Sequence, residues 1–247
     1  MELYIIRHGQ SVNNAIMEDQ KLRVQDPELT EVGHQQADYT AKFLSTATNL
    51  EQIVRHPADS PKREAPHRHD ITHLYCSAMH RAMQTARPIG EALNLNPSIW
   101  LEIHEHGGIY LDDDNGVPVG YGGMTRTEIQ TAFPNYILPE AITDSGWYKP
   151  ESGFEDLSLC QARAVRVKQA LMERAALEES QNDSVAIVSH GTFIDALLKA
   201  FLNNLPGEQY FYWHYNTGIS RLDILPNRQV IIRYINRVTH LPAELVT

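Results

Sequence analysis

Two apolar runs of strand length, at residues 3–6 and 185–188, are each followed by one polar residue, then a histidine and a glycine. A segment that can form a helix comes next, which is the pattern of a strand that ends in a tight turn. In open α/β sheets, ligands bind at the edge formed by the carboxyl ends of the strands. The sequence therefore predicts that His8 and His190 lie together at such an edge and form a paired-histidine site.

Strand-like and helix-like segments alternate over most of the chain. Further strands are expected at 71–76, 99–103 and 230–235, with one or two more within 210–225, and helices at about 11–19, 30–50, 82–93, 125–133, 153–179 and 192–203. This alternation predicts an α/β fold with three layers, α/β/α, in which a mostly parallel sheet carries helices on both faces. We expect the 247 residues to form a single domain over residues 1–247.

Two segments interrupt the alternation. Residues 51–70 hold three prolines and no apolar period, so a surface insertion is expected there. Its histidines, including His67 and His69, match no zinc signature and are expected to be solvated. Residues 107–150 are rich in glycine and proline, which predicts a cap-like lid over the sheet edge. The acidic triplet at 112–114 lacks the glycine-spaced loop of calcium sites, so we interpret it as a solvated turn.

The charge balance limits the classes of partner. The formal net charge is −10 and the isoelectric point is near 5.6, which argues against nucleic acid or a membrane surface as the main partner. No apolar run approaches the roughly 18 residues that span a bilayer, and a strand from residue 2 leaves no room for a signal peptide. Cys76 and Cys160 make neither a disulfide framework nor a metal pair, so a cytoplasmic location is expected. The sequence leaves the oligomeric state open, monomer or oligomer.

The side chains that follow strand ends suit attack on a phosphoryl group. A neutral imidazole such as that of His8 is a nucleophile. Arg7 and Arg81 each offer a planar guanidinium that can hold two phosphate oxygens, and His190 is a further donor. With this much positive charge and hydrogen bonding around the phosphoryl oxygens, the attack needs no metal ion.

Backbone and amide groups beside the first histidine complete this expected pocket. The segment after His8 begins at Ser11 and predicts a helix N-terminus with free N–H groups, and Asn14 stands six residues past His8. Gly9 and Gly191 allow the backbone to turn sharply or to approach a ligand closely. We therefore assign Ser11, Asn14, Gly9 and Gly191 to substrate binding.

A carboxyl group is also required, because the leaving alcohol needs a proton and the attacking water must lose one. One group whose pKa is raised by burial can do both in turn. Glu102 and Glu105 both lie where a predicted strand ends. We prefer Glu105 because it stands just before Gly107 and Gly108, where the chain leaves the sheet, and we retain Glu102 as the alternative.

Together these residues resemble the histidine phosphatase superfamily, which has the phosphoglycerate-mutase-like fold. The matching blocks stand in family order: Arg7-His8-Gly9, Asn14, Leu29-Thr30-Glu31-Val32-Gly33, the block of Ser77, Arg81, Ala82, Gln84, Thr85 and Ala86, and Ser189-His190-Gly191. The resemblance implies that His8 accepts the phosphoryl group, that a glutamate is the acid and base, and that no metal or organic cofactor takes part. It also implies a phosphate pocket made of Arg7, Arg81, His190 and Asn14.

The function expected from the sequence is that of a metal-independent, histidine acid phosphatase-like phosphomonoesterase. It would hydrolyse a small-molecule phosphate ester through a phosphohistidine on His8, and a phosphate or sulfate ion is expected to bind in the site. A phosphoglycerate mutase shares every pocket residue, but segment 107–150 is poor in cations that could hold a second phosphate or carboxylate. A non-catalytic phosphate- or phosphopeptide-binding module is the third interpretation, which the presence of both histidines, both arginines and a glutamate disfavours.

Other side chains are expected to have structural roles. Three arginines that do not follow a strand end are expected at the surface: Arg87, Arg163 and Arg166. Two histidines are expected to be solvated: His80 and His104. Three aromatic side chains are expected to pack the 107–150 segment onto the sheet: Tyr110, Tyr121 and Trp147.

Overall fold

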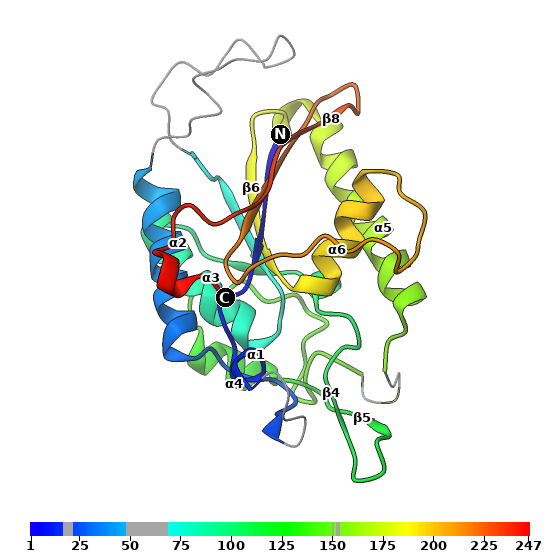
Figure 1. Ribbon diagram of the computed structural model, residues 1–247. Helices are drawn as coiled ribbons and strands as arrows, with labels where there is room; N and C mark the ends of the chain where they lie inside the picture. The colour runs from blue at the N-terminus through cyan, green and yellow to red at the C-terminus, as the bar shows by residue number, and fades with distance from the viewer. Residues whose placement is uncertain (17–21, 48–68, 150, 152–153) are drawn as a thin grey trace.

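The computed structural model describes residues 1–16, 22–47, 69–149, 151 and 154–247. Its central element is a six-stranded sheet with the order β3-β2-β6-β1-β7-β8 (Figure 1). The strands are β1 (Glu2–Arg7), β2 (His73–Cys76), β3 (Ser98–Ile99), β6 (Ser184–Ser189), β7 (Ile219–Ile224) and β8 (Val230–Arg237). Strands β3, β2, β6 and β1 are parallel, whereas β7 is antiparallel to both β1 and β8. The mostly parallel sheet predicted from the sequence is confirmed.

Helices cover both faces of this sheet, with α2 and α3 on one side and α5 and α6 on the other (Figure 1). The α-helices are α1 (Val12–Ala15), α2 (Glu31–Thr46), α3 (His80–Leu93), α4 (Arg126–Ala132), α5 (Leu157–Ala176) and α6 (Gly191–Phe201). Side chains alternate across a strand, so Tyr4 and Ile6 of β1 join the core beneath α2 and α3. Leu3 and Ile5 join the core beneath α5 and α6. An apolar run without alternation is what a strand buried on both faces requires.

The helix starts follow local capping chemistry. The Thr30 side chain accepts a hydrogen bond from the N–H of Gly33, and α2 begins at the next residue after Thr30. The Asp156 side chain accepts from the N–H of Leu159, so α5 begins at Leu157 rather than near residue 153. These caps determine where each long helix begins, and through it the residues that face the sheet.

Residues 107–149 carry a small hairpin and one helix. The hairpin pairs β4 (Tyr110–Asp112) with β5 (Pro118–Gly120), and α4 follows it. Trp147 is buried and Tyr121 packs against the same core as α2 and α3, as expected for side chains that fix this segment to the sheet. Tyr110 instead stacks edge-on against Phe154, with ring centroids 4.8 Å apart.

The strand expected at 99–103 is much shorter. Only Ser98–Ile99 pairs with β2, and Leu101–Ile103 forms a 3₁₀ turn. The carbonyl of Ile103 accepts a hydrogen bond from the Ser189 hydroxyl at 2.7 Å, and one side chain of α5, Arg163, donates to the carbonyls of Glu102 and His104. These bonds replace a strand ladder and turn the chain away from the sheet.

The insertion expected at 51–70 falls outside the described residues except at its end. There, His69 is buried, not solvated, with its Nδ1 atom 3.3 Å from the Tyr4 hydroxyl. Cys76 and Cys160 are buried free thiols. None of the helices in the described part of the chain is both long and apolar enough to cross a bilayer.

Candidate active site

The two histidine–glycine corners meet because their strands are neighbours. Strands β1 and β6 are parallel, and Arg7 pairs with Ser189 in the register. The next residue in each chain segment is therefore a histidine at the same edge. The rings of His8 and His190 lie with their centroids 5.0 Å apart, so the structure places together the pair that the sequence predicted.

The ring of His8 is held in one tautomer. Its Nδ1 atom lies 2.6 Å from the carbonyl oxygen of Gly9, and because a carbonyl can only accept, Nδ1 carries the proton. The Nε2 atom keeps its lone pair, and the Nε–H of Arg81 donates to it at 3.2 Å. Burial, and then the charges of Arg81 and Arg7, hold the pKa of His8 well below its usual value. A neutral ring with an unprotonated Nε2 is a competent nucleophile.

His190 and Arg7 present buried nitrogens beside that ring. Both ring nitrogens of His190 and the Nε of Arg7 have no hydrogen-bond partner within the described residues. Buried polar atoms are almost always paired in folded proteins, so these three nitrogens are available to a polar ligand. Burial also holds the pKa of His190 well below its usual value, with Arg81 the next cause.

The two guanidinium groups approach His8 from different elements. Arg7 ends β1 and donates from Nη1 to the carbonyl of His214. Arg81 lies in the first turn of α3, is 8% exposed, and has the Asp26 carboxylate 3.9 Å away. Burial lowers the pKa of both arginines, but a guanidinium stays charged in a protein. Two fixed positive charges therefore face the same imidazole.

The segment after His8 differs from the expectation. Helix α1 has four residues, and Ser11 and Asn14 form its capping box. The N–H groups of Ser11 and Val12 bond to the Asn14 side chain and to the carbonyl of Glu28, so they are not the free donors that the sequence suggested. The Oδ1 atom of Asn14 accepts those cap bonds, which leaves its Nδ2 amino group to donate to a ligand.

The two corner glycines have different roles. A Cβ on Gly9 would lie 2.5 Å from the carbonyl oxygen of Gly33 in α2, so Gly9 is required by close backbone packing. A Cβ on Gly191 would lie 3.5 Å from the Nε of Arg7, which is an ordinary contact. Only Gly9 is therefore required on steric grounds.

The two candidate glutamates lie in different places in the structure, one in the pocket and one at the surface. Glu105 lines the same pocket as Arg7, His8 and Arg81. Its carboxylate accepts from the N–H groups of Phe193 at 2.9 Å and Thr192 at 3.2 Å, in the first turn of α6, and from its neighbour His106 at 2.8 Å. Glu102 lies outside the pocket, in a surface ion pair with Arg166 at 2.8 Å.

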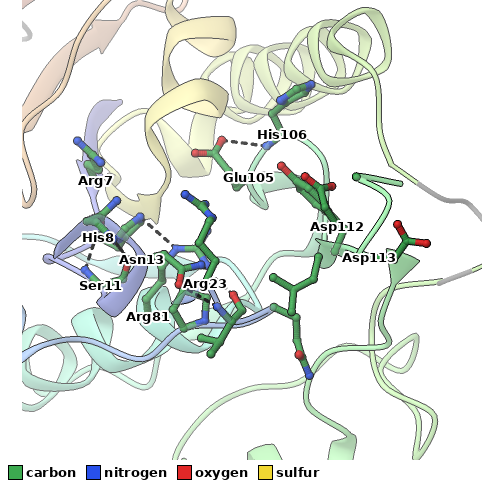
Figure 2. Close-up of a pocket in the computed structure, with 18 of the residues that line it drawn as sticks. Arg7, His8, Ser11, Asn13, Arg23, Arg81, Glu105, His106, Asp112 and Asp113 are labelled. Carbon is green, nitrogen blue, oxygen red and sulfur yellow. Dashed lines mark hydrogen bonds between the residues drawn. The ribbon is translucent and has the colours of Figure 1, made fainter. Parts of the chain in front are cut away.

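The pocket has a volume of about 980 Å³ and extends from His8 to the β4–β5 hairpin. Figure 2 shows Arg7 and His8 on one side, Asp112 and Asp113 on the other, and Arg23 between them. The sequence did not single out Arg23, Asn13 or His106 as pocket residues, because none of them directly follows a predicted strand and their place on the pocket depends on tertiary packing. Across the described residues, no three His, Cys, Asp or Glu side chains are grouped to hold a metal ion.

Several solved structures share this fold, and two of the three described here are phosphatases by name. A mycobacterial glucosyl-3-phosphoglycerate phosphatase is 21% identical with a TM-score of 0.55, over 96% of this chain and 99% of that one. A phosphoserine phosphatase from Entamoeba histolytica is 17% identical with a TM-score of 0.58, over 98% and 99%. The Bacillus stearothermophilus protein YhfR is 21% identical with a TM-score of 0.57, over 97% and 98%. A search of curated protein sequences found no match.

A comparison with models of protein families matches residues 3–59 and 62–237 to branch 1 of the histidine phosphatase superfamily. The match includes both histidine–glycine corners, Arg81 and Glu105. This chain therefore belongs to the histidine phosphatase superfamily.

Proposed function

We propose that this protein is a phosphomonoester hydrolase that acts through a phosphohistidine on His8, without a metal ion. The observation that carries the proposal is the neutral His8 ring, with its Nε2 lone pair directed at Arg81 and the unpartnered nitrogens of His190 and Arg7 beside it. These groups can bind phosphoryl oxygens and offset the charge that develops on them. The phosphatase neighbours of the same fold support the same class of reaction.

The reaction would take place in two steps. In the first, the Nε2 lone pair of His8 forms a bond to phosphorus, the bond from phosphorus to the ester oxygen breaks, and protonated Glu105 gives that oxygen its proton. In the second, the Glu105 carboxylate takes a proton from water, the water oxygen bonds to phosphorus, and the phosphorus–nitrogen bond breaks. After the second step the enzyme is back in its starting state, with His8 free of phosphate and Glu105 protonated.

The pocket supports a small, polar leaving group. Its volume of about 980 Å³ exceeds what a phosphate needs, and its side opposite His8 carries the carboxylates of Asp112 and Asp113, with Arg23 in between. Two structural neighbours are named as phosphatases of glucosyl-3-phosphoglycerate and of phosphoserine, which are small polar phosphate esters. The carboxylates disfavour a second phosphate, which supports a hydrolase over a mutase.

Two buried free thiols support a reducing, cytoplasmic location.

Hydrolysis of p-nitrophenyl phosphate in excess EDTA tests this proposal. Wild-type turnover should survive chelation, whereas the kcat of His8→Ala should be at least about 100-fold lower than that of the wild type. His34→Ala, in an exposed position on α2, is the matched control and should keep wild-type activity. Turnover that EDTA removes, or that His8→Ala retains, would contradict the mechanism. Turnover of 3-phosphoglycerate into its isomer in place of free phosphate would identify a mutase.

A further inference from the structure

Arg163 of helix α5 is buried, with 3% of its surface exposed, although the sequence suggested a surface charge. Its Nε and Nη2 atoms donate to the two carboxylate oxygens of Glu155 at 2.8 and 2.6 Å. A planar guanidinium fork on a carboxylate is the strongest geometry for such a pair. The sequence did not indicate this burial, because the partner of Arg163 lies eight residues earlier, in the segment before α5.

The remaining donors of Arg163 hold the turn that carries the candidate acid. Its Nη1 atom donates to the carbonyl oxygens of Glu102 at 2.6 Å and His104 at 2.8 Å. Its Nη2 atom also lies 3.7 Å from the Cys160 sulfur. All five N–H groups of the guanidinium are then used. A lysine has three donors and no planar fork, so it cannot make this set of bonds.

The Arg163–Glu155 ion pair also contacts two other parts of the chain that hold Glu105 in place, the Phe193 ring in α6 and the backbone of Gly107. The Arg163 guanidinium carbon lies 4.5 Å from the centre of the Phe193 ring, and the Phe193 N–H donates to the Glu105 carboxylate. The Glu155 N–H donates to the carbonyl of Gly107 at 3.4 Å. Arg163 and Glu155 therefore fix the backbone before Glu105, the backbone after it, and the helix end that holds its carboxylate.

We propose that Arg163, held by Glu155, is a positioning residue that places the Glu105 carboxyl group at the leaving oxygen of the phosphate ester. This inference rests on the proposed function, since it requires Glu105 to be the proton donor. Arg163 lines no part of the pocket and touches the reaction only through the 102–107 turn and Phe193. A displacement of about 1 Å at a reacting group can cost roughly 100-fold in rate.

The test compares two esters that differ in their need for a proton. p-Nitrophenolate can leave without being protonated, whereas the glycerol oxygen of glycerol 2-phosphate must receive a proton in order to leave. For both esters, kcat/KM reports the first step, in which the ester bond breaks. For Arg163→Lys we expect kcat/KM to fall about 10- to 100-fold on glycerol 2-phosphate and less than about threefold on p-nitrophenyl phosphate. The inhibition constant of inorganic phosphate should stay unchanged, because the pocket around His8 keeps its residues.

Arg166→Lys is the matched control, three residues further along α5. Arg166 bonds the Glu102 side chain at the surface, where Arg163 bonds the backbone of the same residue. It should keep wild-type kcat/KM on both esters. In the double variant Glu105→Gln/Arg163→Lys, the second change should add no selective loss, because a positioning residue has nothing left to position.

The outcomes separate the two proposals. Selective loss in Glu105→Gln without selective loss in Arg163→Lys would overturn the positioning role and leave the proposed function intact. Equal loss on both esters, or selective losses that add in the double variant, would overturn it as well. If Glu105→Gln shows no selective loss, the assignment of the acid is wrong. Where Arg163→Lys does not fold, Glu155→Gln takes its place and must give the same selective pattern.

Discussion

At the scale of single residues, the Glu105 carboxylate is held by three backbone N–H groups. In the proposed first step this group gives its proton to the leaving oxygen, and in the second step its carboxylate takes a proton from water. The three donors come from the start of α6 and from the residue next to Glu105, so they fix the position of the carboxyl oxygens in the pocket.

Glu105→Gln should lower kcat on p-nitrophenyl phosphate by about 100-fold, because the phosphohistidine would lose its base. Glu102→Gln should stay within about twofold of wild type, since an exposed ion pair contributes little. Steady-state kinetics of the two variants measures this. A larger loss in Glu102→Gln would mean that the alternative glutamate is the acid and base.

At the scale of elements, the approach of β1 to α2 depends on two glycines. The backbone after β1 passes so close to α2 that a Cβ on Gly9 would meet the carbonyl oxygen of Gly33 at 2.5 Å. Backbone atoms cannot rotate away as a side chain can, so the helix or the strand would have to shift. This contact fixes the distance between α2 and the backbone that follows β1, which carries His8.

Gly9→Ala should lower the free energy of unfolding by about 1–3 kcal/mol, the usual cost of overpacking. Gly207→Ala is the control, because a Cβ there would have no neighbour within 4 Å, and it should be neutral or slightly stabilising. Urea unfolding followed by circular dichroism measures both. An unchanged midpoint for Gly9→Ala would show that the strand and helix can separate at little cost.

The same scale shows why the sequence predicted some elements better than others. β1 and β6 are continuous apolar runs with polar turns at their ends, so their position and the placement of His8 and His190 could be predicted locally. The end of β3 depends on Arg163, whose bonds reach carbonyls about sixty residues away in the chain. No local pattern carries that information. The placement of Arg23 and Asp112 on the pocket depends on loop packing in the same way.

At the scale of the whole molecule, buried histidines link stability to pH. Burial lowers the pKa of His104 and of His240 from 6.5 to about 4. Below pH 6.5 the unfolded chain binds protons at these residues that the folded chain does not. Their contribution to stability is therefore complete above pH 6.5 and is lost as the pH falls toward 4.

As the pH falls from 6.5 to 5, each of these histidines should lower the free energy of unfolding by about 2 kcal/mol. His240→Gln should reduce the loss by one such contribution, because the proton uptake of that residue disappears. Urea unfolding at pH 7 and pH 5 measures the difference. Equal losses in the wild type and the variant would show that His240 is not neutral in the folded protein.

The strand order has a consequence for biosynthesis. β1 is made first, but its two neighbours in the sheet are β6 and β7, which begin at residues 184 and 219. At about 5–20 residues per second, a ribosome needs on the order of ten seconds or more to supply them. An apolar strand with both edges unpaired is a target for aggregation during that time. We expect the nascent chain to need chaperone protection, and phosphate binding to begin only after the last third of the chain has emerged.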